Sequence, residues 1–181
     1  MPRVYLSPSL QEYNEYVNGG TEEEIANLIT DAMEPYLMAS GVSFGRNDPQ
    51  MSLGEAIAES NAGDYDLHFA IHSNAAPPSL AGKLQGTDAY YFYNSPYGEE
   101  AANFVADNMK QIAPNPNKVE AVPTVTLREL RRTNVPSVLG EVGYHDNPEE
   151  AAWIKDNIDD IAKALAKSIT DYFGVPFQMP K

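Results

Sequence analysis

Short apolar segments alternate with amphipathic helical stretches along almost the whole chain of 181 residues. The segments that read as strands are 4–6, 42–44, 66–72, 89–93, 119–125 and 136–143. The stretches with helical spacing of apolar residues are 21–40, 52–62, 99–112 and 150–173. This alternation predicts an α/β fold in which helices cover both faces of a twisted, mostly parallel sheet. The length favours a single three-layer domain over residues 1–181.

Local signals mark the ends of two of these elements. Thr21 and Glu24 have the spacing of a capping box, which predicts the start of the first helix. Pro123 cannot donate a backbone hydrogen bond, so the segment around it is predicted to be an edge strand.

Composition excludes several classes of partner and location. The chain has 26 acidic and 12 basic residues, a net charge of −14, which would repel the phosphates of nucleic acid. It has no apolar run of about 18 residues, so we expect no membrane span. The start of the chain lacks the pattern of a signal peptide, so we expect none, and storage in the cytoplasm is compatible with the sequence.

His72 is the first candidate functional residue. It stands at the end of an apolar strand and is followed by the hydroxyl of Ser73 and the amide of Asn74. Side chains at the carboxyl ends of strands in an open α/β sheet gather at the ligand cleft. The chain has three histidines and no cysteine, so any transition-metal site must use imidazole, carboxylate or amide ligands.

Glu141 is the second candidate, because it lies within the apolar strand 136–143. A buried carboxylate needs either a partner or a raised pKa. A raised pKa is what a general base of hydrolysis requires. The structural alternative is an ion pair with an arginine of the preceding segment, and the candidates are Arg128, Arg131 and Arg132.

Three further positions have competing interpretations. The glutamates 22–24 at the start of a helix are favoured by the helix dipole, and Glu24 also serves the capping box. His68 precedes His72 by four residues, but on a strand the two would stand about 13 Å apart, which favours a hydrogen-bonded core histidine. His145 lies on a turn, where it is either a solvent-facing or capping residue, or a group that binds metal or substrate.

The chain resembles the zinc-dependent N-acetylmuramoyl-L-alanine amidases in several motifs that follow one another in the family's order. Residues 70–74 (Ala-Ile-His-Ser-Asn) resemble the family's Ser-Ile-His-Ala-Asn strand, and residues 141–147 resemble its Glu-x-Gly-Phe-x-x-Asn signature. Residues 23–28 resemble its Glu-x-x-x-Asn-Leu helix start. Residues 86–91 and 127–139 resemble the strand after the zinc histidine and the approach to the base.

The resemblance implies a peptidoglycan hydrolase that cleaves the amide between N-acetylmuramic acid and the L-alanine of the stem peptide. It implies that Glu23 and His72 bind zinc and that Glu141 is the general base for a metal-activated water. We also expect Asn74, His145 and Asn147 to contact the substrate. Action on such a substrate implies a location in the cell wall, or outside the cell after release.

One ligand of the family's zinc site has no counterpart. The family's first strand ends in Asp-Pro-Gly-His-Gly, and its histidine binds zinc, whereas this chain has Ser7-Pro8-Ser9-Leu10-Gln11. Leu10 cannot bind a metal, and the amide oxygen of Gln11 is a weak ligand for zinc. Gln11 is the first candidate for the third position, and Asn14 and His145 are the others.

Two other functions remain open from the sequence. A module on the same fold could bind peptidoglycan without cleaving it, as the missing histidine suggests. A zinc peptidase would use the same site on a peptide bond. The sequence does not indicate an oligomeric state.

Overall fold

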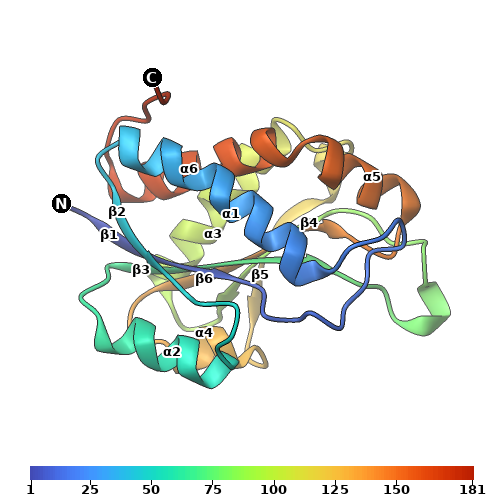
Figure 1. Ribbon diagram of the computed structural model, residues 1–181, viewed down its shortest axis with the longest axis horizontal. Helices are drawn as coiled ribbons and strands as arrows, with labels where there is room; N and C mark the ends of the chain where they lie inside the picture. The colour runs from blue at the N-terminus through green and yellow to red at the C-terminus, as the bar shows by residue number, and fades with distance from the viewer.

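Six strands form one sheet at the centre of the computed structural model, which describes residues 1–181 (Figure 1). The strands are β1 (Arg3–Pro8), β2 (Ser43–Arg46), β3 (Leu67–Asn74), β4 (Thr87–Phe92), β5 (Val119–Thr124) and β6 (Ser137–Tyr144). Their order across the sheet is β2-β1-β3-β6-β4-β5. All neighbouring pairs are parallel except β4 and β6, which are antiparallel. β5, which contains Pro123, is an edge strand as predicted.

Helices cover both faces of this sheet, which confirms the predicted α/β class (Figure 1). The helices are α1 (Glu22–Ala39), α2 (Leu53–Ala62), α3 (Pro96–Lys110), α4 (Arg128–Arg132), α5 (Pro148–Asp156) and α6 (Ile158–Phe173), with 3₁₀ turns at Pro78–Leu80 and Pro116–Lys118. In Figure 1, α1, α3 and α6 lie on one side of the sheet and α2 and α4 on the other. None of these helices combines the length and apolar character needed to cross a membrane.

The helices differ from the sequence prediction in two places. The five-residue helix α4 was not predicted, because so short a helix has no apolar period to reveal it. The predicted helix 150–173 is two helices that meet at Asn157. The side chain of Asn157 donates to the carbonyl of Trp153, and its backbone is not helical, so the run of apolar residues continues across a break.

The alternation of side chains gives the sheet two different faces. Leu67, Phe69 and Ile71 of β3 belong to a core cluster of 31 buried residues, which includes residues of α1, α3 and α6. His68 and His72 occupy the alternate positions, so they face the other side. In β6, Glu141 likewise alternates with core residues and pairs in register with His72. The side chains of His72 and Glu141 therefore lie on the face opposite the main core.

The apolar packing on this second face is small. The cluster of buried residues there contains Ala70, Leu130 and Leu139. Leu130 comes from α4, so this short helix packs against the sheet through one buried leucine. The rest of the face is free to hold polar and titratable side chains.

The turn into β4 depends on a glycine. Gly86 has φ +122°, and a Cβ at this position would meet the carbonyl oxygen of Lys118 at 2.2 Å. We predict that Gly86→Ala lowers the free energy of unfolding by about 1–3 kcal/mol, because a methyl group adds a backbone clash to the strained φ. Urea denaturation measures this. The matched control is Gly19→Ala, which has φ +96° but no atom within 4 Å of the added Cβ. Equal losses in both variants would contradict the clash.

Candidate active site

Glu22 and His72 are in direct contact at the centre of the candidate site. Oε1 of Glu22 lies 2.9 Å from Nδ1 of His72, and both side chains are buried. The other oxygen, Oε2, accepts a hydrogen bond of 2.7 Å from the amide of Asn14. The contact joins the first turn of α1 to the carboxyl end of β3, two segments 50 residues apart.

The structure brings Glu22, and not Glu23, to His72. Glu22 shares a helical face with Ile25 and Ile29, which pack into the main core, so the face turns inward. Glu23 is only half-buried and has no hydrogen bond to its carboxylate, and its backbone carbonyl accepts from Asn27. The Glu-x-x-x-Asn-Leu spacing selected Glu23, whereas the apolar period of the helix would have selected its neighbour.

The end of β1 contributes polar groups but no imidazole. The amide of Asn14 donates to Oε1 of Gln11 at 2.5 Å as well as to Glu22, so Gln11 lies beside the Glu22 carboxylate. Leu10 and Gln11 line a cavity of about 270 Å³ together with His72. Gln11 therefore lies near His72, as predicted, but beside Glu22 in place of the predicted Glu23.

Glu141 stands next to His72 on the neighbouring strand. Its Oε2 is buried and has no hydrogen-bond partner, and none of the ion pairs in the structure joins it to an arginine. Burial raises the pKa of Glu141 to about 7; His72 opposes this shift, while Glu22 and Asp88 add to it. The alternative of a structural arginine partner is therefore not realised, and the carboxylate is free to exchange a proton near neutral pH.

The pKa values of Glu22 and His72 shift in opposite directions. Burial by itself would raise the pKa of Glu22, but hydrogen bonds from His72 and Asn14 outweigh it and hold this pKa below its ordinary value. Burial by itself would lower the pKa of His72, but Glu129 and Glu22 raise it well above its ordinary value. Both shifts favour the charged forms, because each partner stabilises the charge of the other.

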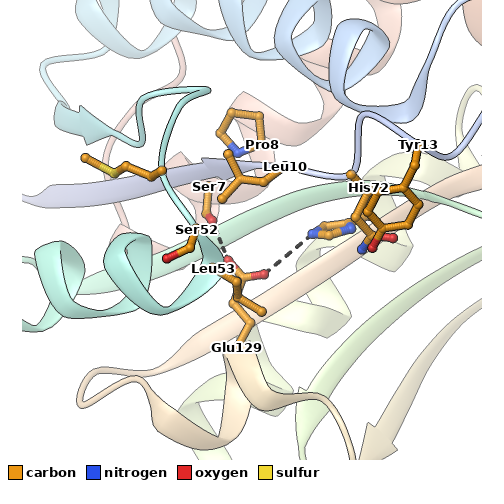
Figure 2. A pocket seen from close by; sticks show the side chains of 10 residues that line it. Ser7, Pro8, Leu10, Tyr13, Ser52, Leu53, His72 and Glu129 are labelled. Carbon is orange, nitrogen blue, oxygen red and sulfur yellow. Dashed lines mark hydrogen bonds and ion pairs between the residues drawn. The ribbon is translucent and has the colours of Figure 1, made fainter.

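Glu129 is a site residue that the sequence did not reveal. It comes from α4, is 3% exposed, and lines the same cavity as His72 (Figure 2). Its Oε2 lies 3.5 Å from Nε2 of His72, and its Oε1 accepts from His68 and from the hydroxyl of Ser7. Burial would raise its pKa, but hydrogen bonds from His68 and His72 hold the pKa of Glu129 well below its usual range.

His68 is a hydrogen-bonded core histidine, as predicted. It is fully buried, with Nδ1 2.9 Å from the hydroxyl of Ser60 and Nε2 2.8 Å from Glu129. The carboxylate of Glu129 fills the space between the two histidines of β3, which a strand holds apart.

The three predicted substrate contacts have different surroundings. Asn74 is half-buried at the end of β3, with its amide 3.5 Å from Asp88. His145 is buried, unlike a solvent-facing residue: it stacks on Tyr16 and shares a hydrogen bond with Ser73. Asn147 caps α5: its side-chain oxygen accepts from two backbone N–H groups, and its amide donates to a loop carbonyl. Of these three residues, only Asn74 is not buried.

The donor set fits zinc in type but is short of one ligand. No group of three or more histidine, cysteine, aspartate and glutamate side chains is arranged to hold a metal ion. A carboxylate and an imidazole in contact, Glu22 and His72, are ligands that zinc accepts, and Gln11 supplies an amide oxygen beside them. The buried Oε2 of Glu141 has no hydrogen-bond partner in the chain.

Comparisons with known proteins show which proteins this chain is similar to. AmiC2, an N-acetylmuramoyl-L-alanine amidase of Nostoc punctiforme, superposes with a TM-score of 0.83 at 18% identity, over 96% of this chain and 97% of that chain. The CwlD amidase of Clostridioides difficile, solved in complex with the GerS lipoprotein, gives 0.83 at 18% identity, over 96% and 99%. The uncharacterized protein YqiI of Bacillus subtilis (strain 168) is 24% identical over 86% of this chain and 76% of that protein.

The likeness to these structures establishes the fold. The family model described as N-acetylmuramoyl-L-alanine amidase matches residues 11–171, which is most of the chain. This chain therefore belongs to the N-acetylmuramoyl-L-alanine amidase family.

Proposed function

We propose that this protein cleaves the amide bond between N-acetylmuramic acid and the L-alanine of the peptidoglycan stem peptide, with Glu141 as the general base. The observation that carries the proposal is the half-buried side chain of Glu141: its Oε2 is buried and unpartnered, its pKa is raised to about 7, and the residue lies in register beside His72. The family match gives the substrate class. Such a substrate places the action in the cell wall, or outside the cell after release.

The chain's own residues divide the work of hydrolysis. Oε2 of Glu141 accepts a proton from the attacking water and returns it to the nitrogen of the departing alanine. The alanine therefore leaves as a neutral amine and not as an amide anion. The amide of Asn74 lies 3.5 Å from Asp88, which pairs in register with Glu141, and we expect this amide to hydrogen-bond the substrate. Asn74 is the last residue of β3, and Glu141 lies within β6.

We further propose that Glu22 and His72, with Gln11 as a weaker third ligand, hold a zinc ion. When bound, zinc would supply the positive charge that polarises the carbonyl of a neutral amide. Glu22 takes the role that the sequence pattern gave to Glu23, because Glu22 contacts His72. With an amide as third ligand, we expect weaker zinc retention than a site with two histidines would give.

The general base can be tested by substitution. Glu141→Gln keeps the shape of the side chain but cannot accept a proton, so kcat for release of the stem peptide from purified peptidoglycan should fall about 10²–10⁴-fold. Mass spectrometry of the products identifies the bond that is cut. Glu149→Gln, at an exposed position of α5, is the matched control and should keep full activity. Full activity in Glu141→Gln would remove Glu141 from the mechanism, and products cut at a peptide bond would indicate a peptidase.

The pH profile gives an independent test of the same group. A base must be deprotonated to act, and the pKa of Glu141 is about 7. We therefore expect kcat/KM to fall about tenfold per pH unit below pH 7 and to level off above it. A profile that is flat from pH 5 to pH 7 would show that no group with this pKa limits the reaction.

The zinc ligands can be separated by two neighbouring substitutions. Glu22→Gln should weaken zinc binding by at least about 100-fold, more than is typical for a residue outside the ligand shell. Glu23→Gln should leave zinc binding unchanged, because its carboxylate does not contact His72. Elemental analysis of protein purified without chelator, followed by competition with a chromophoric chelator, measures both. The opposite ranking of the two variants would restore Glu23 as the ligand.

A further inference from the structure

The cavity beside His72 extends away from the proposed general base. It is lined by residues of β1, of the loop after β1, of the start of α2 and of α4, and neither Glu141 nor Asn74 contributes to its wall. β3, which carries His72, lies between β1 and β6 in the sheet. The cavity therefore lies on the β1 side of His72, whereas Glu141 stands on the β6 side.

The two ends of the scissile amide must lie on different sides of His72. In the reaction proposed above, Glu141 returns its proton to the nitrogen of the departing alanine, so the stem peptide leaves on the β6 side. The lactyl group and the sugar that bears it are attached to the other end of the same amide. They therefore extend toward the β1 side, where the cavity offers about 270 Å³.

The lining of this cavity fits a neutral sugar better than a peptide with free carboxylates. Its wall has no lysine or arginine that could pair with a carboxylate, and its one imidazole, His72, already faces Glu22 and Glu129. The glycan strand is uncharged once the lactyl carboxyl is held in an amide, whereas the stem peptide keeps free carboxylates. Hydroxyl and amide groups alternate in the wall with apolar side chains such as Leu10 and Leu53, and a sugar presents both kinds of surface.

Tyr13 lines the same cavity and has no partner in the chain (Figure 2). Its side chain is 75% exposed, and it takes part in none of the aromatic pairs of the structure. Tyr16, in the same loop, is by contrast buried and stacks on His145. The ring of Tyr13 is therefore available to a molecule that enters the cavity.

The backbone on both sides of Tyr13 is held by hydrogen bonds. The side chain of Asn14 donates to Gln11 and to Glu22, and its backbone carbonyl accepts from the N–H of Glu22 at 2.8 Å. Tyr16 anchors the next part of the loop through its stacking on His145. An exposed ring on a segment that is already ordered binds a ligand with little further loss of conformational entropy.

We propose that Tyr13 is a glycan-binding residue: its ring stacks on the apolar face of a sugar of the glycan strand, and the cavity beside His72 receives the groups next to that sugar. The inference rests on the function proposed above and identifies the part of the substrate that this side of the site recognises. An aromatic ring presents a negative face to the C–H groups of a pyranose, so the stacking depends on the ring and not on the phenolic hydroxyl.

Binding of a peptide-free sugar tests the proposal without hydrolysis. The probe is the linear tetramer of N-acetylglucosamine (chitotetraose), titrated into the full chain in a calorimeter. Tyr13→Ala should weaken binding about tenfold, and Tyr13→Phe should bind like the wild type because it keeps the ring. Tyr93→Ala and Tyr97→Ala are matched controls: these tyrosines are 62% and 64% exposed but do not line the cavity, so the affinity should not change.

Three results of this titration would overturn the proposal. The first is a wild type that does not bind the tetramer even at its highest soluble concentration. The second is a folded Tyr13→Ala that binds the tetramer as tightly as the wild type does. The third comes from a free stem peptide used as a second probe: binding that depends on Tyr13 for this peptide, and not for the tetramer, would assign the cavity to the peptide.

Steady-state kinetics on purified peptidoglycan separate this inference from the proposed function. Tyr13→Ala should raise KM about tenfold and leave kcat nearly unchanged, because it removes binding without touching Glu141. A lower kcat at unchanged KM would contradict a binding role. Tetramer binding through Tyr13 in a protein that releases no stem peptide would overturn the proposed function alone. Release of stem peptide with the same KM in Tyr13→Ala and wild type would overturn the inference alone.

Discussion

The contact between Glu22 and His72 is the interaction on which the rest of the site depends. It joins the first turn of α1 to the carboxyl end of β3, and so it sets where the helix begins relative to the sheet. Two features of α1 support this contact. The helix dipole stabilises a carboxylate in the first turn, and the capping box of Thr21 and Glu24 fixes the residue at which the helix begins. Ile25 and Ile29 on the same face pack in the core, so the side that holds Glu22 has to turn inward.

The two faces of the sheet differ in composition, and this difference explains how so small a protein accommodates buried charged side chains. One face carries the cluster of 31 buried residues and supplies most of the apolar burial. The other has only a small cluster around Leu130 and is occupied by a hydrogen-bonded series of histidines and glutamates. Because each buried carboxylate of that series faces an imidazole, the cost of removing it from water is offset locally. Glu141 lies outside this series: its buried Oε2 has no partner, and burial raises its pKa.

Much of this arrangement could be predicted from the sequence. The α/β class could be predicted because apolar strand segments alternate with helices that carry an apolar stripe. The spacing of apolar residues shows directly which side of each element faces a core. His72 and Glu141 could be identified because each is a titratable residue in an apolar strand, and the structure pairs them in register.

Other features depend on contacts that no local pattern encodes. Glu23 was predicted in place of Glu22, because the prediction followed the Glu-x-x-x-Asn-Leu spacing and not the helical period of the apolar residues. Glu129 lies in a five-residue helix between arginines, and its burial follows from Ser7 and His68, which are distant in the chain. His145 is buried because Tyr16, from the long first loop, stacks on it.

The location of zinc in crystals of the wild-type protein tests the central claim most directly. Diffraction data collected on both sides of the zinc absorption edge show where the ion lies. The account predicts a single anomalous peak in contact with the carboxylate of Glu22 and with Nδ1 of His72, on the side of the ring away from Glu129. A peak at any other place, or zinc-saturated crystals without a peak from a protein that releases stem peptide, would contradict it.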